Sequence, residues 1–417
     1  MTMKHRKYRR TVMARAAFVA LLAALGVGQA LLERTAAAQA RGGVQAPRFE
    51  VDPLWPKPLP NHWILGSAIG VAVDADDHIW IIHRSSATLN NNEKTLETQQ
   101  GDCCAGAPPI LEFDQAGNLL RHWGGPGAGY EWPDSNHGIF IDYKGNVWIG
   151  GNGGPDSHVL KFTKDGKFLL QIGKKGARRA AGAAAGAGEG AQAGFAGGSN
   201  DQESFGRVAK IFVDAKANEA YIADGYLNKR VAVLDADTGK MKRWWGAYGN
   251  KPDDAPLPAY DPDAQPAQQF RNPVHCSDMS LDRLLYVCDR VGDRLQVFTP
   301  EGRFVKEAFY HKRTKNAGSV WDVAFSKDAQ QKYIFMADGV NEKVRVIDRQ
   351  TLQELTNFGD GGRQPGSFYG VHSIATDSKG NVYTTETYEG KRVQRFVYKG
   401  VGPVAADQGV LWPRSSR

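Results

Sequence analysis

Three of the ten histidines stand at the same position of a repeated sequence unit. Each of the six copies of this unit has an apolar segment that ends in Asp or Ser, at Asp74, Asp142, Asp214, Ser280, Ser326 and Asp377. Five residues before that end, the second, fourth and sixth copies carry His137, His275 and His372. Three imidazoles that leave one coordination position open are typical of a catalytic zinc site. If the copies surround one axis, the sequence predicts that these side chains hold one zinc ion.

Charged and phenolic side chains recur at a second position, near the end of the second apolar segment of the unit. Arg84 and Arg290 lie ten residues after Asp74 and Ser280, and Tyr226 lies at the matching end in the third copy. The planar guanidinium of Arg pairs with a carboxylate through two hydrogen bonds. A tyrosine beside a dication can lose its proton and act as a base. We therefore expect these three side chains to face the metal and an anionic substrate.

The six copies predict an all-β fold, a six-bladed β-propeller with four strands in each blade. The first two strands of each copy are apolar, aromatic-rich runs joined by a turn, at residues 70–84, 138–151, 210–225, 276–290, 322–339 and 373–388. Five copies continue with a hairpin, whereas the sixth lacks its last strand, and we expect the segment near Phe49 to complete it. Because the inner strands of a propeller line a central channel, alternate blades place equivalent residues about 120° apart. The predicted propeller spans residues 49–400.

The two ends of the chain differ from the repeats. Residues 1–40 combine basic residues, an apolar stretch and the small-residue site Ala38-Gln39-Ala40, which is the pattern of a secretory signal peptide. A membrane-spanning anchor is the alternative, but the apolar stretch is short and ends at the cleavage site. Arg9-Arg10 resembles a twin-arginine export signal, which leaves the export route open. We expect a linker at 41–48, a tail at 401–417, and a periplasmic or secreted protein without a stable membrane anchor.

The charge of the chain argues against nucleic acid as a partner. The formal charge is +7, but residues 1–40 contain seven Lys or Arg and one Glu, so removal of the leader leaves about +1. A nearly neutral protein lacks the basic excess that binds phosphate backbones. The expected partner is instead a small molecule or peptide that carries a carboxylate.

The four cysteines fit an oxidising compartment. Cys276 and Cys288 fall on neighbouring strands of the fourth copy, where a disulfide is possible, whereas the adjacent Cys103 and Cys104 are not expected to pair without strain. Cys276 directly follows His275 and should point away from the metal, because neighbouring side chains of a strand face opposite sides. Irregular insertions interrupt the repeats at 85–109, 174–204 and 249–270, and the Gly/Ala-rich second one is expected to be a flexible surface loop.

Several of these segments, in this order, resemble the peptidyl-α-hydroxyglycine α-amidating lyases, which are zinc-dependent propeller enzymes built from NHL-type repeats. The matching motifs extend through most of residues 64–400 and are Gly70-Val-Ala-Val-Asp74, Ile82-His83-Arg84, His137-Gly138, Asp224-Gly225-Tyr226, Pro273-Val274-His275, Asp289-Arg290 and His372. The resemblance implies a carbon–nitrogen lyase that converts a C-terminal α-hydroxyglycine, or a related carbinolamide, into an amide and glyoxylate. It assigns zinc to the three histidines, the role of general base to Tyr226, and the substrate carboxylate to Arg84 with Arg290.

The sequence also departs from this family. Where the family has an Asp that serves a structural calcium ion, this chain has Ser373, which puts calcium in doubt. Leu227 and Tyr286 stand where the family has disulfide cysteines, and Gly370 replaces a Met two residues before the third histidine. Two other functions therefore remain open, a metal-dependent hydrolase of the lactonase-like propeller type and a non-catalytic NHL-type binding propeller.

Overall fold

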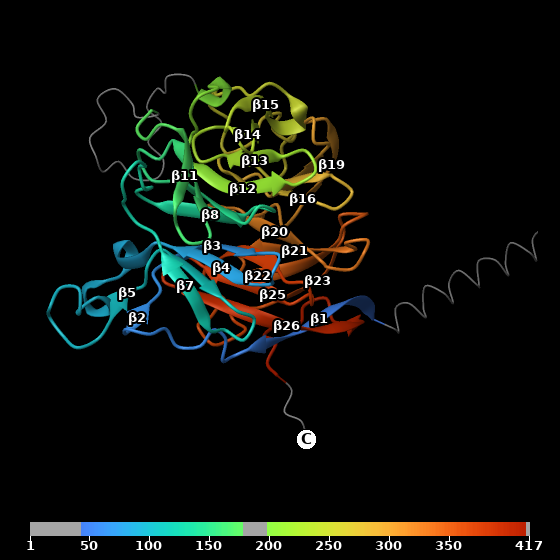
Figure 1. The fold of residues 1–417 in the computed structure, drawn as a ribbon. Helices are drawn as coiled ribbons and strands as arrows, with labels where there is room; N and C mark the ends of the chain where they lie inside the picture. Colours follow the sequence, from blue (N-terminus) through green and yellow to red (C-terminus); the bar gives the residue numbers. More distant parts are fainter. Residues whose placement is uncertain (1–42, 178–197, 414–417) are drawn as a thin grey trace, which may run out of the picture.

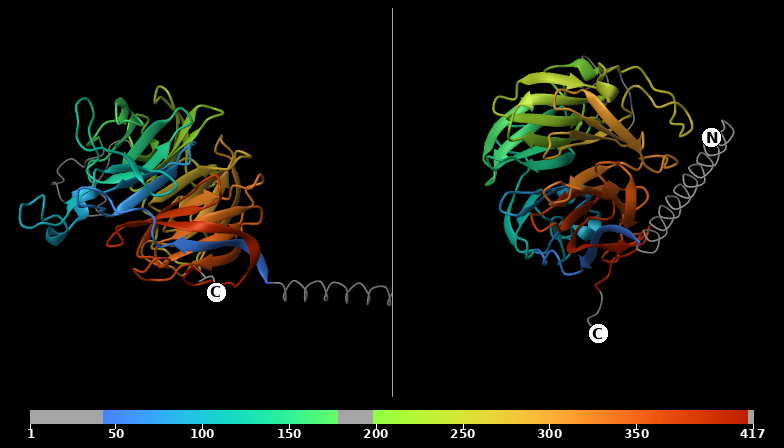
Figure 2. Two further views of the ribbon diagram at one scale, coloured as in Figure 1. Left: turned by 60° about the horizontal axis from the view of Figure 1, so that its bottom comes forward. Right: turned by 90° about the vertical axis from the view of Figure 1, so that its right-hand side faces the viewer.

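The computed structural model describes residues 43–177 and 198–413, and the expected signal peptide at 1–40 lies outside them. Within these ranges the strands form six four-stranded sheets and one two-stranded sheet. The six larger sheets lie around a common centre (Figure 1, Figure 2). The predicted all-β, six-bladed propeller is therefore confirmed.

In the first three blades the strands follow one another outwards from the centre. Blade 1 comprises β3 (Ala68–Val73), β4 (Ile79–His83), β6 (Ile110–Phe113) and β7 (Leu119–Trp123). Blade 2 comprises β8 (Asn136–Ile141), β9 (Asn146–Gly151), β10 (His158–Thr163) and β11 (Phe168–Gly173). Blade 3 comprises β12 (Val208–Asp214), β13 (Glu219–Asp224), β14 (Arg230–Asp235) and β15 (Met241–Trp245).

The fourth and fifth blades repeat this order, and the sixth is completed from the other end of the chain. Blade 4 comprises β16 (Val274–Met279), β17 (Leu285–Asp289), β18 (Arg294–Phe298) and β19 (Phe304–Phe309). Blade 5 comprises β20 (Asp322–Phe325), β21 (Tyr333–Asp338), β22 (Lys343–Asp348) and β23 (Glu354–Phe358). Blade 6 comprises β24 (Val371–Thr376), β25 (Val382–Glu386), β26 (Arg392–Val404) and β1 (Val44–Asp52).

The first strand of each blade packs against the first strands of both neighbouring blades. The contacts run in the circular order β3, β8, β12, β16, β20, β24 and back to β3. Positions that are equivalent in the sequence alignment therefore surround one axis. This arrangement places the aligned histidines on the same channel.

The N-terminal strand closes the ring, as the sequence predicts. In β1, Phe49 pairs with Tyr398 of β26 and Val51 pairs with Phe396, and both β1 side chains are buried. The two strands are longer than the 49–400 bounds expected for the propeller, because their backbone pairing continues to Val44 and Val404. Strand β1 thus begins inside the residues expected to be a linker.

The Asp residues on which the copies align are structural anchors. Asp74 Oδ1 accepts hydrogen bonds from two backbone N–H groups of the following turn, and its Oδ2 accepts one from Trp80 Nε1 at 3.0 Å. Asp142 bonds Trp148 Nε1 in the same way at 2.9 Å. One carboxylate thus joins the turn to the aromatic residue of the second strand, which explains why both recur in the sequence.

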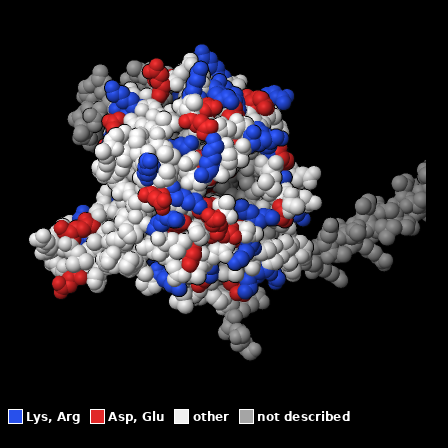
Figure 3. Space-filling view, in the orientation of Figure 1, with Lys and Arg blue, Asp and Glu red and all other residues white. Residues whose placement is uncertain are grey.

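The insertions and the loops beside them carry the remaining short elements. They include η1 (Ser85–Thr88), η2 (Asn91–Glu93), η3 (Gly198–Asn200), η4 (Ala247–Gly249) and β5 (Ala105–Gly106), which pairs in parallel with β2 (Trp63–Ile64). Most of the expected flexible loop at 174–204 lies outside the described residues. No helix in the described parts of the chain is long and apolar enough to cross a membrane. On the face in Figure 3, Lys and Arg side chains are interspersed with Asp and Glu.

All four cysteines are paired. Cys276 in β16 is bonded to Cys288 in β17, which are directly opposite each other in the sheet. Cys103 is bonded to Cys104, the adjacent pair that the sequence analysis did not expect to form without strain. These two lie in the insertion of the first blade, where Cys104 has a φ of 118°, so they do not follow the alternation of a regular strand.

Candidate metal centre

The structure brings the three predicted histidines together at the centre of the ring. His137 lies in β8, His275 in β16 and His372 in β24, and each is at most 4% exposed. Their ring centroids are 4.8 to 5.2 Å apart. One ring nitrogen of each lies within 4.8 Å of those of the other two. Imidazoles from alternate blades thus converge on one point, as the ligands of a single metal ion must.

Backbone carbonyl groups fix the orientation of all three rings. Nδ1 of each histidine lies 2.6 to 2.7 Å from the carbonyl oxygen at the aligned position of the following blade, in the pairs His137 with Ala209, His275 with Trp321, and His372 with Ile69. A carbonyl oxygen only accepts, so Nδ1 carries the hydrogen in each ring. The lone pair is then on Nε2, which is the arrangement found in metal-bound histidines with an outer carbonyl partner.

Irregular pairing at the start of the inner strands helps to direct these side chains. The register between the first and second strands shifts between Ala68 and Gly70, His137 and Ile139, Val208 and Lys210, Val274 and Cys276, and Val371 and Ser373. Such β-bulges redirect side chains near functional sites. In blade 2 the bulge includes Gly138, which has a φ of +68°.

Burial sets the protonation of the histidines. Removal from water lowers the pKa of His137 and of His275 well below the ordinary value, and the positive charge of Arg290 acts in the same direction on both. Burial, together with Arg290 and Arg84, lowers the pKa of His372 to about 3. All three imidazoles are therefore neutral at pH 7 and available as ligands.

The predicted base contacts two of the histidines. The Tyr226 hydroxyl lies 2.9 Å from His137 Nε2 and 3.1 Å from His275 Nε2. Arg290 Nη1 donates to the same hydroxyl at 3.3 Å, and its guanidinium lies 4.6 Å from the ring centroid of Trp321. The phenol and one predicted guanidinium thus belong to the histidine cluster.

Arg84 is oriented by a different partner. Its Nη2 donates to Asn152 Oδ1 at 2.8 Å, and Ser135 Oγ donates to the same oxygen at 2.8 Å. The Nε atoms of Arg84 and Arg290 are both buried, and neither has a hydrogen-bond partner among the described residues. Buried donors without partners suit a carboxylate ligand, because leaving them unpaired costs free energy.

Asn152 is a site residue that the sequence analysis missed. It lies ten residues after Asp142, which is the spacing that identifies Arg84 and Arg290 in their own copies. The same alignment could therefore have found it. An uncharged amide suggests a role in binding less clearly than a guanidinium does, but the Asn152 side chain accepts the hydrogen bond that orients Arg84.

Two other groups of potential ligands in the described chain already have partners. In the first, Lys164 Nζ lies 2.7 Å from Asp74 Oδ2, and Glu112 Oε1 lies 2.8 Å from His78 Nδ1. In the second, the Cys276 sulfur is in a disulfide, and Asp278 and Asp322 share an ion pair with Lys210. The neutral imidazoles, each with an Nε2 lone pair, are therefore the set that fits zinc.

Two proteins that are named for peptide amidation are similar to this chain in sequence. The chain is 23% identical over 334 residues to a probable peptidyl-alpha-hydroxyglycine alpha-amidating lyase of Caenorhabditis elegans, covering 77% of this chain and 80% of that protein. It is 26% identical over 247 residues to peptidyl-glycine alpha-amidating monooxygenase A of Xenopus laevis, covering 58% of this chain and 22% of that protein. No protein-family model matches the chain.

Solved structures give only a loose match. A streptogramin B lyase aligns with a TM-score of 0.48 and 14% identity, covering 85% of this chain and 98% of that chain. The first sequence relative covers a larger share of both chains than the second. The chain therefore has weak homology to the peptidyl-α-hydroxyglycine α-amidating lyases, in agreement with the resemblance of its motifs.

Proposed function

We propose that this protein is an exported, zinc-dependent lyase that cleaves the C–N bond of a peptidyl-α-hydroxyglycine, or of a related carbinolamide, to an amide and glyoxylate. The observation that carries the proposal is the convergence of His137, His275 and His372 with Tyr226 and Arg290 in contact. The homology to proteins named as amidating lyases supports this reaction over the hydrolysis of a lactone.

The chain supplies a base beside the metal ligands. Zinc bound by the three histidines would act as a Lewis acid on the substrate hydroxyl. Tyr226, as the phenolate, accepts the hydroxyl proton, and the freed electron pair forms the carbonyl group of glyoxylate as the C–N bond breaks. The leaving amide nitrogen takes up one proton, so Tyr226 can return the proton that it accepted.

The two arginines bind the substrate carboxylate in this proposal. Their buried Nε atoms have no partner among the described residues, and a carboxylate would satisfy both. Holding the carboxylate fixes the carbinolamide relative to Tyr226 and the histidines. A structural calcium ion is not part of the proposal, because Ser373 offers a hydroxyl where the family has a carboxylate.

Export is supported by two features of the chain. The first 40 residues have the pattern of a secretory signal peptide. Both cysteine pairs of the described residues are oxidised, as is usual in the periplasm or outside the cell.

The decisive experiment compares the mature protein with Tyr226→Phe. Metal content is measured on both, and glyoxylate release from α-hydroxyhippurate is assayed. We expect one zinc per chain in both proteins and a loss of kcat of about 10²- to 10⁴-fold in the variant, because general base catalysis contributes about that much.

Tyr383→Phe is the matched control. Tyr383 is a buried tyrosine of blade 6 whose hydroxyl donates to Asp377, away from the histidines. Its replacement should leave kcat unchanged. Bound zinc without glyoxylate release from the wild-type protein would instead favour a hydrolase, and a protein that binds no metal would favour a binding propeller.

A further inference from the structure

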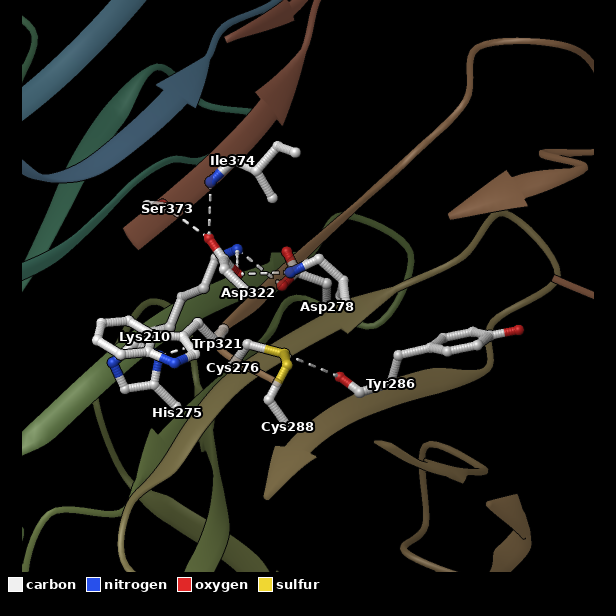
Figure 4. Close-up of a disulfide and its surroundings, with 11 residues drawn as sticks. Lys210, His275, Cys276, Asp278, Tyr286, Cys288, Trp321, Asp322, Ser373 and Ile374 are labelled. Atoms are coloured by element: carbon white, nitrogen blue, oxygen red, sulfur yellow. Dashed lines mark hydrogen bonds and ion pairs between the residues drawn. A yellow bond between two sulfur atoms is a disulfide. The ribbon is translucent and has the colours of Figure 1, made fainter. Parts of the chain in front are cut away.

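A buried ion cluster joins the inner strands of three blades. Lys210 in β12 places its ammonium nitrogen 2.8 Å from Asp278 Oδ2 in β16 and 2.5 Å from Asp322 Oδ1 in β20. Figure 4 shows the ammonium between the two carboxylates. Burial alone would lower the pKa of Lys210, but Asp278 and Asp322 outweigh it and raise the pKa above its ordinary range. The ammonium therefore stays charged in the interior.

Ser373 extends this cluster to two more blades. Its hydroxyl donates to Asp322 Oδ2 at 2.7 Å and accepts from the backbone N–H of Val71 in β3 at 3.4 Å. The N–H of Ile374 also donates to Asp322 Oδ2, at 3.1 Å. We refer to Lys210, Asp278, Asp322 and Ser373 as the polar ring. Through these contacts it connects the inner strands of five blades.

The polar ring is joined to the histidines through the backbone. Three of its members directly follow residues that orient or carry an imidazole: Lys210 follows Ala209, Asp322 follows Trp321, and Ser373 follows His372. The imidazoles and these three members also line one cavity of about 10 Å³, which has room for roughly one water molecule. A shift of the polar ring therefore moves the carbonyl groups that aim the imidazoles.

We propose that Lys210 is a positioning residue for the metal centre, and that its ion pairs with Asp278 and Asp322 fix the spacing of the histidine-bearing strands. A buried ammonium has few alternative positions, because leaving its carboxylates exposes an uncompensated charge to the interior. The inference rests on the proposed function, since it requires metal at the histidines. In this proposal Lys210 acts through the strands and touches neither the metal nor the substrate.

The test compares Lys210→Met with Lys161→Met in the full mature protein. Lys161 is also a buried lysine, 6% exposed, but it bonds Ala236 O at 2.8 Å and lies in β10, away from the channel. Zinc affinity is measured by competition with a chelator, and the visible spectrum of the Co²⁺-loaded protein reports the ligand geometry. We expect Lys210→Met to lower zinc affinity by about 10- to 100-fold and to change the Co²⁺ spectrum.

The two lysine variants should differ in zinc affinity. Lys161→Met should keep wild-type zinc affinity and spectrum even if it unfolds more easily. It loses the contact with Ala236 O and an ion pair of 3.8 Å with Asp142, which lies at the opposite end of β8 from His137. Equal effects of the two substitutions, or an unchanged or higher zinc affinity in Lys210→Met, would overturn the positioning role while the metal centre stands. A wild-type protein that binds no zinc overturns the proposed function and this inference with it.

A milder pair of variants covers the case in which Lys210→Met does not fold. Ser373→Ala removes the hydroxyl that bonds Asp322, and Ser277→Ala removes a buried hydroxyl of β16 that bonds Tyr221 O at 3.2 Å outside the polar ring. We expect Ser373→Ala to lower zinc affinity by about 2- to 10-fold, the value of one hydrogen bond, and Ser277→Ala to leave it unchanged. Equal zinc affinities in these two variants would contradict the role of the polar ring.

Discussion

Each site histidine gives its Nδ1 hydrogen to a carbonyl of the next blade and keeps its Nε2 lone pair for the channel. The same geometry recurs three times, because the histidines and the carbonyl groups occupy one aligned position in alternating blades. The same hydrogen bond between a histidine and a carbonyl group, repeated in alternate blades, therefore produces a site with threefold spacing. Tyr226 breaks the symmetry by contacting His137 and His275.

The low pKa of the buried imidazoles predicts acid sensitivity of the metal-free protein. The pKa of His372 is about 3 in the folded state, against about 6.5 in an unfolded chain. As the pH falls below about 6.5, the unfolded state takes up a proton that the folded state does not, so stability declines by about 1.4 kcal/mol per pH unit for this group. The free energy of unfolding is measured by urea titration between pH 7 and pH 5. As the pH is lowered, it should fall less steeply in His372→Gln than in the wild-type protein. Identical slopes would refute the assignment of a neutral buried imidazole.

Asn152 is expected to act on the substrate through Arg84. In Asn152→Ala the guanidinium loses the amide that holds it, so the KM for α-hydroxyhippurate should rise by about tenfold, the value of one charge-assisted hydrogen bond, with a smaller change in kcat. Steady-state kinetics measures both constants. Asn146→Ala is the control, because its amide bonds Asp142 in the same blade and does not reach Arg84. A loss of kcat alone in Asn152→Ala would contradict a carboxylate-binding role for Arg84.

The aligned repeat was sufficient to predict the histidines, Arg290 and Tyr226 as neighbours, but not the polar ring. Lys210 and Asp322 directly follow the aligned position, and regular alternation would turn them away from the histidines. Cys276 in the same position does turn away, into its disulfide. The long side chain of Lys210 reaches Asp278 and Asp322 in the next two blades, and no sequence period shows these contacts.

At the level of strands, one glycine allows the close approach of two blades. A Cβ atom on Gly138 would lie 2.6 Å from Ala209 O, the carbonyl that orients His137, and the φ of Gly138 is +68°. The β-bulge at this position therefore needs a residue without a side chain.

Gly138→Ala should weaken metal binding as well as stability. The left-handed backbone alone costs about 1 to 2 kcal/mol, and the clash with Ala209 O displaces the partner of His137. Gly145→Ala provides the control: its φ is +77°, but the nearest atom to the added Cβ is Lys164 Cε at 3.7 Å. Both variants should lose free energy of unfolding, and only Gly138→Ala should lose zinc affinity in the chelator titration. Equal zinc affinities would argue against a role of the bulge in aiming His137.

The strands could be predicted from the sequence because apolar runs alternate with turns. The ion pairs between the strands could not be predicted. Ion pairs with a buried carboxylate connect the end of the second strand to the first part of the third in four blades. They are Asp224 with Arg230, Asp289 with Arg294, Asp338 with Arg345, and Glu386 with Arg392. Their sequence separation varies with the length of the turn, so the alignment did not bring them into one column.

At the scale of the whole molecule, stability depends on closing the ring. Phe49 of β1 is 4% exposed and packs against Phe335 and Phe358 of blade 5. Phe49→Ala should lower the free energy of unfolding by about 3 to 5 kcal/mol, as measured by urea denaturation. Phe304→Ala, at a residue 36% exposed in β19, should cost clearly less. Comparable losses in both variants would mean that β1 does not hold the ring closed.

The joining of β1 to β26 has a consequence for biosynthesis. Val44 is synthesised some 360 residues before its partner Val404. Strand β1 therefore cannot pair until β26, the last strand, has been made. Until then β1 and the outer edge of β25 present unpaired backbone groups that can pair with other chains. Newly made chains therefore pass through an open-ring stage, and a nascent chain stalled before residue 392 lacks the strand that pairs with both β1 and β25.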